Sequence, residues 1–548
     1  MSNTIEFTKA QSAAITARGG SLLVSAAAGS GKTRVLVERA VGLIIDPDHP
    51  IEADSLLMMT FTNAAAAKLR ADITERLAEE VRADPGNSRL RRQQMRLQRA
   101  SIGTVDAFCL HFVQQHFTAL EIPPDFETAD EATLGRIRQD TLAAVLEQAY
   151  ANPDFRAFAD LYDRGRTDST AGNVVLELYE FTRALPHPNR ALREFATQWQ
   201  ADLPPAQTLW GRTLLCGAVD RVRGILRLLE AALQAAAQDE LADRAFTGVL
   251  LDDQSRLERL AKVLENADWD GAIAALDEEG GWKRPGRING GRSANPAASA
   301  AAELRDRAKK QTEQLRKDWL LCTAAEFAAD RRRAAPLVEA LVQTVQLFAD
   351  AYFQAKLAEK VLDYADYEHL TLDLLQTQDG ARTPLCKTVS RQYAAVLVDE
   401  YQDTNALQDA IYFSLAAPDA SNLFFVGDIK QSIYRFRQAD PSVFAAKQAA
   451  WRPYPDPQQI PFKEPATISL DANFRSAPAV IEGINDIFET IFSESLGGIA
   501  YGKGQRLVVG KPSDYRGLCE IDVLENADAA SDAAMIAARI REMQAEGY

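Results

Sequence analysis

The chain has 548 residues, of which 47% are hydrophobic, and at about 100–200 residues per domain this length predicts roughly three to five domains. Such a length and composition exclude a small disulfide-stabilised domain and a wholly disordered chain. With 61 Lys and Arg against 77 Asp and Glu, the net charge of −16 argues against a protein that coats nucleic acid uniformly, but it leaves room for local basic channels.

The cysteines and the apolar segments indicate a soluble cytoplasmic protein without a membrane contact. The five cysteines are scattered, and no two of them have the spacing of metal ligands. No stretch approaches the ~20 apolar residues of a membrane helix. Residues 1–11 lack the apolar core of a signal peptide.

In chain order, buried strands and helices alternate first. Residues 21–28 and 55–60 have the apolar pattern of short buried strands, and each precedes a helical pattern, the second at about 63–83. Strands that are apolar throughout and alternate with helices are typical of a parallel sheet covered on both faces. The fold class predicted from this pattern is therefore α/β.

The middle of the chain has a different character, because helical periodicity dominates from about 115 to 360 and no strand runs stand out. The helical segments are 131–150, 206–243 and 301–360, while residues 280–299 carry Gly and Pro without a period and predict an exposed loop or hinge. Strand patterns return at 394–398, 423–426 and 467–470. The sequence thus predicts an α/β domain interrupted by a large helical insertion.

Residues 26–33 have the pattern of a phosphate-binding loop, with Ala26 where the usual pattern has Gly. Glycines let backbone N–H groups turn toward a phosphate, the lysine supplies a charge for the β- and γ-phosphates, and the threonine hydroxyl is a ligand for Mg²⁺. The alternative is a Gly-Ser-Gly turn with a surface lysine. The predicted nucleotide-binding residues of this loop are Ala26, Ala27, Ala28, Gly29, Ser30, Gly31, Lys32 and Thr33.

An acidic pair follows the apolar run at 394–398, and it is the expected partner of the loop. A carboxylate at the end of an apolar strand can reach a metal ion beside the phosphates, and Asp399 has this position. Glu400 is suited to be the base that activates water. A solvated acidic strand end is the alternative. Together, the loop and the acidic pair predict a nucleoside triphosphatase.

Several further segments resemble motifs of the UvrD-type superfamily-one helicases, in the order that this family has. They are residues 8–15, 60–66, 102–109, 426–437 and 473–476. Residue 106 is Asp where the family usually has His, so its role is open. Residues 24–33, 398–405 and 428–437 resemble more closely the AddA subunit of bacterial helicase–nucleases.

The resemblance implies that MgATP lies in a cleft between two RecA-like domains. Lys32, Thr33, Asp399 and Glu400 would hold and hydrolyse it, with Thr33 and Asp399 as the Mg²⁺ ligands. Gln11 would read the adenine, Gln431 would sense the γ-phosphate, and Arg475 would reach across as an arginine finger, with a surface ion pair as its alternative. Arg39 has helical spacing from the loop and is a further candidate for the nucleotide pocket; a charge on the helix surface is the competing interpretation.

The resemblance also implies a single-stranded DNA track across the top of both domains. Small polar and basic groups would contact its backbone, and aromatic rings would stack on its bases. The candidates are Phe61, Thr62, Asn63, Thr104, Tyr434, Phe436 and Arg437. For Phe61 and Phe436 the alternative is a packing role. A separate run at 89–99 holds five Arg and no acid, which indicates either a phosphate-facing strip or a solvated helix face.

The predicted domains are 1–115 and 361–450 for the two parts of the first RecA-like domain, 116–360 for the helical insertion, and 451–548 for the start of a second RecA-like domain. We find neither the later helicase motifs nor a nuclease motif after residue 485, so we expect an incomplete chain. The resemblance implies a bacterial 3′–5′ DNA helicase motor for double-strand break repair and recombination, with an AddB-like partner and duplex-end DNA. The alternatives are a UvrD-like repair helicase and a module that binds ATP and DNA without hydrolysis.

Overall fold

A parallel seven-stranded sheet organises the chain, in the order β3-β2-β6-β7-β1-β9-β8. The computed structural model describes residues 6–162, 169–200, 202–278, 282–288, 295–454, 463–492, 501–502, 504–511, 520–524 and 528–547. The strands of the sheet are β1 (Leu22–Ala26), β2 (Leu56–Thr60), β3 (Ser101–Thr104), β6 (Ala395–Val398), β7 (Leu423–Gly427), β8 (Arg452–Pro453) and β9 (Ala466–Leu470). The five strands predicted from apolar runs are all confirmed, and the sheet is parallel as expected.

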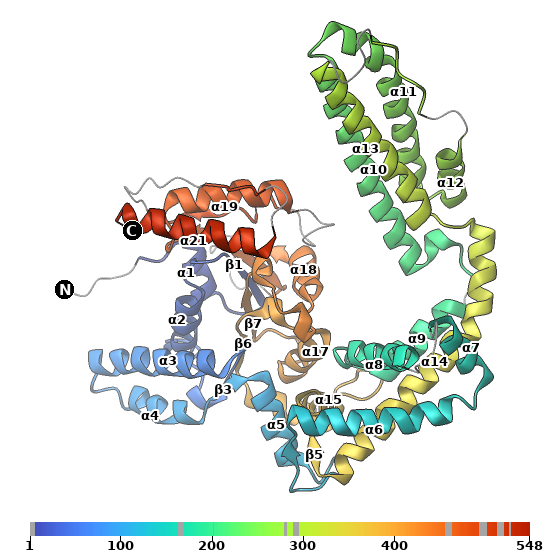
Figure 1. Cartoon of the computed structure of the whole chain (residues 1–548). Coiled ribbons are helices and arrows are strands. Elements are labelled where there is room, and N and C mark those ends of the chain that lie inside the picture. Colours follow the sequence, from blue (N-terminus) through green and yellow to red (C-terminus); the bar gives the residue numbers. More distant parts are fainter. Residues whose placement is uncertain are drawn as a thin grey trace.

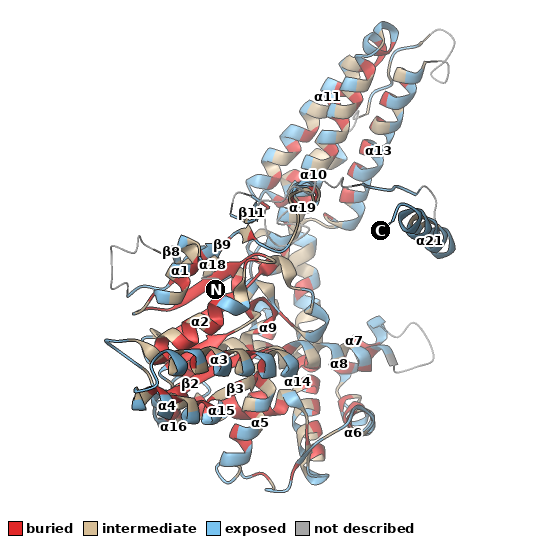
Figure 2. Cartoon of the chain, turned by 90° about the vertical axis from the view of Figure 1, so that its left-hand side faces the viewer, coloured by how far each residue is buried: buried red, intermediate tan, exposed pale blue. Residues whose placement is uncertain are grey.

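Helices cover both faces of this sheet (Figures 1 and 2). Successive residues of a strand point to opposite faces, so strands that are apolar throughout need cover on both. In β1, Leu22 and Val24 pack into one apolar core, and Leu23 packs into the other. The first core contains α1 (Lys9–Thr16), α2 (Lys32–Ile45) and α3 (Asn63–Ala83). The second contains α5 (Val105–His116), α15 (Tyr364–Leu375), α16 (Pro384–Val389), α17 (Ala406–Leu415) and α18 (Pro441–Ala450).

The helices between the two halves of the sheet form two further bodies, each with its own core. The first consists of α6 (Glu131–Ala149), α7 (Pro153–Tyr162), α8 (Ser169–Arg183), α9 (Pro188–Gln200) and α14 (Ala324–Ala358). The second is an arm of α10 (Leu209–Ala236), α11 (Glu240–Glu265), α12 (Trp269–Asp277) and α13 (Pro296–Asp318), which projects away from the sheet (Figure 1). A short parallel pair, β4 (Glu127–Thr128) with β5 (Val361–Leu362), lies where the chain enters and leaves these bodies.

Two predicted helical segments are each divided in the structure. The segment at 206–243 contains a break, since Asp239 caps the N-terminus of α11 and accepts hydrogen bonds from the backbone N–H groups of Leu241 and Ala242. The segment at 301–360 is divided at Thr323, which forms a capping box with Glu326. Each of these caps starts a new helix while the spacing of the apolar residues continues across it. The helical periodicity of the sequence therefore joined two successive helices into one predicted segment.

The predicted loop at 280–299 lies partly outside the described residues. Its described parts are 282–288 and 295–299. Residues 282–288 lie along α11, where the N–H of Gly286 donates to the carbonyl of Ala245 at 2.9 Å. From residue 296 on, the loop prediction is wrong, because Asn295 caps α13 and the helix begins there. In the described ranges, no helix is both long and apolar enough to cross a membrane.

The C-terminal part of the chain contacts the phosphate loop through Phe474, whose N–H donates to the carbonyl of Gly29, and through Ile481, which packs in an apolar cluster with Ala27. It contains β10 (Ala472–Asn473), which pairs in parallel with β11 (Val508–Val509), and the helices α19 (Pro478–Ile491) and α21 (Ala529–Ala545). The prediction assigns everything after residue 450 to the second RecA-like domain. However, β9 pairs with β1 along its whole length and β8 pairs with β9, so Arg452–Pro453 and Ala466–Leu470 belong to the first sheet.

The arginine-rich run at 89–99 forms α4 (Ser88–Arg96) and the turn that follows it. Arg89 donates to the carbonyls of Ile44 and Ile51, and Arg96 pairs with Glu52. These two arginines therefore hold α4 to the fold and do not form part of a phosphate-facing strip. Arg91 and Arg92 are exposed.

Candidate functional site

The polar segments singled out in the sequence follow the carboxyl ends of neighbouring strands. The phosphate loop follows β1, Phe61 follows β2, Asp399 follows β6 and Asp428 follows β7. Because the carboxyl ends of parallel strands share one edge of a sheet, these segments meet there, where open α/β sheets bind their ligands.

The phosphate loop has the backbone that its glycines were predicted to allow. Gly29 and Gly31 have φ angles of +70° and +82°, and Gly31 is the N-cap of α2. The Ser30 hydroxyl is buried and has no hydrogen-bond partner in the part of the chain that the structure describes, an arrangement suited to a phosphate oxygen. Ala26 lies within β1, Ala27 is buried beside Ile481, and Thr33 is exposed in the first turn of α2. The loop therefore fits a nucleotide phosphate.

The predicted acidic pair lies beside this loop. The Lys32 ammonium is 3.3 Å from Oε2 of Glu400, although the two residues are far apart in the sequence. Burial, and then the charge of Glu400, raises the pKa of Asp399 to about 6. Glu400 itself has a positive φ of +50°, an uncommon backbone for a residue other than glycine, and such backbones cluster at functional sites. A divalent cation bound here would neutralise this concentration of negative charge.

Two predicted nucleotide contacts have different outcomes. Gln11 lies over the loop, with its amide donating to the carbonyl of Ser30 at 2.9 Å. Arg39, in contrast, is buried, and it donates to the carbonyls of Ala14 and Ala17 while it stacks 4.3 Å from the ring of Phe424. Burial lowers the pKa of Arg39 to about 9. Arg39 therefore fastens α1 to the sheet, and its alternative as a surface charge is wrong. Its place in the nucleotide pocket stays a prediction.

The segment that carries Arg475 contacts the loop directly. The N–H of Phe474 donates to the carbonyl of Gly29 at 3.0 Å. A Cβ atom added at Gly29 would lie 2.8 Å from Oδ1 of Asn473 and 2.9 Å from Cβ of Arg475. Asn473 accepts from the backbone N–H groups of Arg475 and Ser476, which fixes the turn. Arg475 is thus brought to the phosphate loop.

Four of the predicted DNA contacts gather in one group, which we call the aromatic cluster: Phe61, Tyr434, Phe436 and Arg437. Phe61 stacks on Tyr434 with a centroid distance of 4.6 Å, and Tyr434 lies 5.8 Å from Phe436. The Arg437 guanidinium is within 6.0 Å of all three rings. Phe436 is 78% exposed, so a packing role does not account for it.

The three smaller predicted DNA contacts lie at helix starts. Thr62 and Thr104 are the N-caps of α3 and α5 and accept from the N–H groups of Ala65 and Ala107. Asn63 is exposed at the first position of α3. The two threonine hydroxyls therefore have structural partners already, whereas Asn63 faces solvent.

The pocket between the acidic pair and the aromatic cluster holds three residues that the sequence did not single out: Glu368, Asp403 and Gln408. Its other lining residues include Asp106, whose role was open, and the predicted site residues Asp399, Glu400, Thr104 and Arg437. Burial, and then the neighbouring Asp106, raises the pKa of Glu368 to about 8, and burial raises the pKa of Asp106. Asp106 and Glu368 therefore lie next to each other inside the pocket, and each raises the cost of a second negative charge there.

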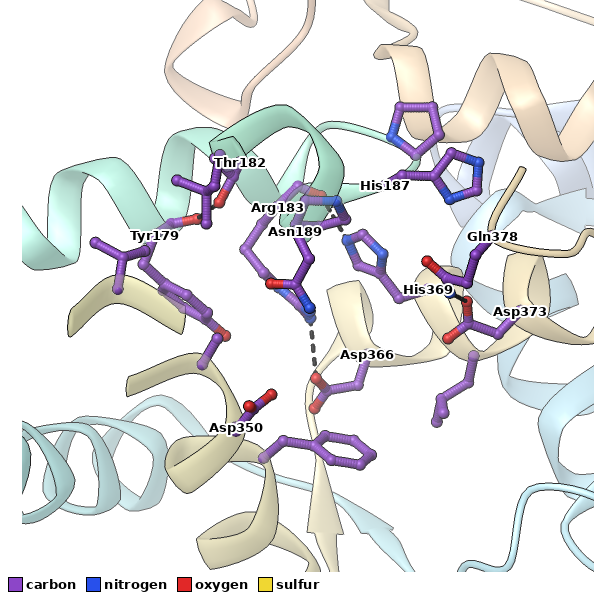
Figure 3. A pocket seen from close by; sticks show the side chains of 17 residues that line it. Tyr179, Thr182, Arg183, His187, Asn189, Asp350, Asp366, His369, Asp373 and Gln378 are labelled. Carbon is purple, nitrogen blue, oxygen red and sulfur yellow. Dashed lines mark hydrogen bonds and ion pairs between the residues drawn. The ribbon is translucent and has the colours of Figure 1, made fainter. Parts of the chain in front are cut away.

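A separate pocket lies between α8, α14 and α15 and contains none of the predicted site residues (Figure 3). Its polar walls are largely paired: Arg183 donates to Asp366 at 2.9 Å, and the His369 ring lies 2.9 Å from the Arg183 carbonyl. Burial, and then the charge of Arg183, lowers the pKa of His369 to about 3, so the imidazole is neutral. These contacts join the helices to one another.

Comparison with known proteins decides the family. The sequence model of the UvrD/REP helicase N-terminal domain matches residues 7–451. The chain belongs to the UvrD/REP helicase family. Similar curated proteins from three bacteria carry one shared name, that of a subunit of an ATP-dependent helicase/nuclease. The protein of Pelotomaculum thermopropionicum is 35% identical over 96% of this chain and 42% of its own length. The protein of Moorella thermoacetica is 36% identical over 92% of this chain and 36% of its own length. That of Geobacillus thermodenitrificans is 34% identical, over 93% and 41%.

These relatives confirm the resemblance to AddA that the motifs indicated. The chain spans about two fifths of the length of the curated relatives it matches.

Proposed function

We propose that this UvrD/REP family chain is the ATP-driven motor of an AddA-type helicase–nuclease. It would translocate 3′ to 5′ on DNA and act at duplex ends in double-strand break repair and recombination. The observation that carries the proposal is the Lys32–Glu400 contact at the same sheet edge as the aromatic cluster. The proposed nucleotide site and the proposed base-stacking surface would then lie next to each other, on the loops that follow neighbouring strands.

We further propose the domain division predicted from the sequence, with one shift. The β4–β5 pair supports a helical insertion at 116–360, because it closes the chain where the insertion begins and ends. The pairing of β9 with β1 supports a second RecA-like domain that starts after Leu470, at β10.

In the proposed reaction, Mg²⁺ bound to ATP supplies a Lewis acid at the β- and γ-phosphates. Thr33 and Asp399 would hold it. Lys32 would contact the phosphates, Glu400 would accept a proton from the attacking water, and Arg475 would stabilise negative charge on the transferred group. Gln11 and Gln431 would read the adenine and the γ-phosphate, and the loop residues from Ala26 to Gly31 would enclose the phosphates.

DNA and an AddB-like protein are the proposed partners. Phe61, Tyr434 and Phe436 would stack on bases, and Arg437, Asn63, Thr62 and Thr104 would lie along the backbone of a single strand. The relatives' shared name describes one subunit of a larger enzyme, which supports the presence of a second one.

The test is ATP hydrolysis by the purified chain with and without single-stranded DNA. We expect stimulation by DNA in the wild type and a loss of about 10³-fold or more in Lys32→Ala. Lys387→Ala, which removes an exposed lysine on α16, should behave as the wild type. Unwinding of duplexes with 3′ tails and not with 5′ tails would support the polarity. Nucleotide binding without hydrolysis in the wild type would instead support the non-hydrolysing module.

A further inference from the structure

Gln402 is a buried side chain that joins the acidic pair to the segment after β7. It lies in a short 3₁₀ turn, Tyr401–Asp403, between β6 and α17, and is 2% exposed. Its Oε1 accepts from the N–H of Asp428 at 2.9 Å. Its Nε2 donates to Oε2 of Glu400 at 2.9 Å and to Oδ2 of Asp403 at 3.1 Å. One amide therefore holds a backbone group of one strand end and two carboxylates of another.

The strand end on the far side of this amide leaves it little room to move. A Cβ atom at Gly427 would lie 2.4 Å from Oε1 of Gln402, so the glycine allows the close approach. The hydroxyl of Ser432 donates to the backbone carbonyl of Gln402 at 3.1 Å. Both ends of segment 427–432 thus contact Gln402, one through its side chain and one through its backbone.

The same segment is internally braced and leads to the aromatic cluster. Lys430 pairs with Asp428 at 2.8 Å, and Gln431 donates to the other oxygen of Asp428 at 2.7 Å. Tyr434 and Phe436 follow within a few residues. A displacement of the aromatic cluster would therefore move the whole segment 427–432. The N–H of Asp428, which donates to the Gln402 amide, would move with it.

On the other side, Oε2 of Glu400 contacts the Gln402 amide at 2.9 Å and the Lys32 ammonium at 3.3 Å. An amide is planar, so its acceptor and donor atoms cannot reorient independently. A shift at Asp428 is passed through this plane to the carboxylate. Oδ2 of Asp403 accepts the other hydrogen bond of the same amide nitrogen, and its Oδ1 is buried without a partner among the described residues.

We propose that Gln402 is a positioning residue that couples the location of the aromatic cluster to the orientation of the Glu400 carboxylate. The proposal rests on the proposed function, since it assigns to this one side chain the link between DNA binding and hydrolysis. Gln402 contacts carboxylates and a backbone N–H, and it acts on the reaction through Glu400.

The experiment uses two variants of Gln402 that lose different side-chain hydrogen bonds. Gln402→Met keeps the length of the side chain but removes all of its hydrogen bonds. Gln402→Glu keeps an acceptor for Asp428 and replaces the donor with a carboxylate that faces Glu400 and Asp403.

The matched control is Gln93, which is also 2% exposed. It likewise accepts from a backbone N–H, that of Ala53 at 2.8 Å, and donates to a carboxylate, that of Glu52 at 2.9 Å, but at α4. Gln93→Met and Gln93→Glu therefore report the structural consequences of the same changes.

Two quantities are measured: the kcat and KM of DNA-stimulated ATP hydrolysis, and the ratio of single-stranded DNA affinities with and without a non-hydrolysable MgATP analogue. In Gln402→Met we expect kcat to fall about 100-fold, as for a misplaced catalytic group, with KM changed by less than about threefold. The affinity ratio should approach one. In Gln402→Glu we expect the fall in kcat with much of the affinity ratio retained. Both Gln93 variants should keep the wild-type kcat and ratio.

Two outcomes would overturn the inference. If Gln402→Met keeps the wild-type kcat and affinity ratio, or if the Gln93 variants lose both equally, Gln402 has no coupling role. These outcomes leave the proposed function intact, because the wild type still hydrolyses ATP and Lys32→Ala does not. If the wild type itself neither hydrolyses ATP nor changes its DNA affinity with nucleotide, the proposed function fails and the inference fails with it.

Discussion

Phe436 exposes an aromatic ring that the fold does not need for packing. Its ring lies 5.8 Å from that of Tyr434 and 6.0 Å from the Arg437 guanidinium, yet 78% of the residue is accessible to solvent. An exposed ring next to a guanidinium is suited to the proposed stacking on a base, since every base has a π-face.

Replacing this ring should therefore affect DNA binding and leave folding unchanged. We expect Phe436→Ala to weaken binding of a single-stranded oligonucleotide by about 1–3 kcal/mol, the value of one base–aromatic stack. Fluorescence anisotropy with a labelled oligonucleotide measures it. Tyr162→Ala removes another exposed ring at the end of α7 and should bind as the wild type. Equal affinity in Phe436→Ala and the wild type would exclude base stacking at this position.

At the residue scale, a site residue could be predicted from sequence when its role depends on its immediate neighbours in the chain. The loop glycines and the Lys32–Glu400 contact could be predicted because each role depends on a residue at the end of an apolar strand. The contacts of Arg39 could not be predicted in this way, because its hydrogen-bond acceptors are backbone carbonyls of another helix. Gln402 was missed for a related reason: its significance comes from Asp428, which is distant in sequence.

At the scale of elements, the phosphate loop and the turn at Asn473 form one close contact that only glycine permits. Gly29 has a φ of +70°, and its Cα faces Asn473 and Arg475 with no space for a side chain. Alanine there would have to push this turn away or distort the loop. Either change would displace Arg475 from the phosphate loop.

We expect Gly29→Ala to weaken MgATP binding about tenfold or more, because a displacement of about 1 Å in an assembled site has effects of this size. The control is Gly380→Ala, at a φ of +85° but with no atom within 4 Å of the added Cβ. It carries only the conformational cost of a left-handed alanine, about 1 kcal/mol in the free energy of unfolding. Titration with a fluorescent nucleotide and thermal unfolding separate the two effects. If the two variants bind nucleotide equally well, the contact with the Asn473 turn is unimportant.

Elements were predictable from sequence where burial is uniform. The strands β1, β2, β6 and β7 are buried at every position, so their apolar runs were distinct. β3 was missed as a strand, because Ser101 and Gly103 interrupt its two buried positions.

At the scale of the whole molecule, a buried cluster of charges joins the first helical body, through α8 and α14, to α15, which packs against the sheet. Lys356, in the last turn of α14, is fully buried, with its ammonium 2.6 Å from Asp363 and 2.5 Å from Asp366. Arg183, from α8, pairs with the same two carboxylates. Burial opposes ionisation of Asp363, but Lys356 and Arg183 outweigh it and lower its pKa to about 2. Two cations and two anions thus balance at the start of α15.

The charge balance of this cluster predicts a large loss of stability on removing one cation. Lys356→Met leaves two buried carboxylates facing one guanidinium, and breaking a buried pair in this way typically costs about 3–5 kcal/mol. Chemical denaturation followed by circular dichroism measures the free energy of unfolding. Lys360→Met, which breaks an exposed pair with Asp125 nearby, should leave the free energy of unfolding unchanged. Adding Asp363→Asn to Lys356→Met should recover part of the loss, because it removes one of the unbalanced charges. A Lys356→Met protein as stable as Lys360→Met would mean that apolar packing alone joins α14 to α15.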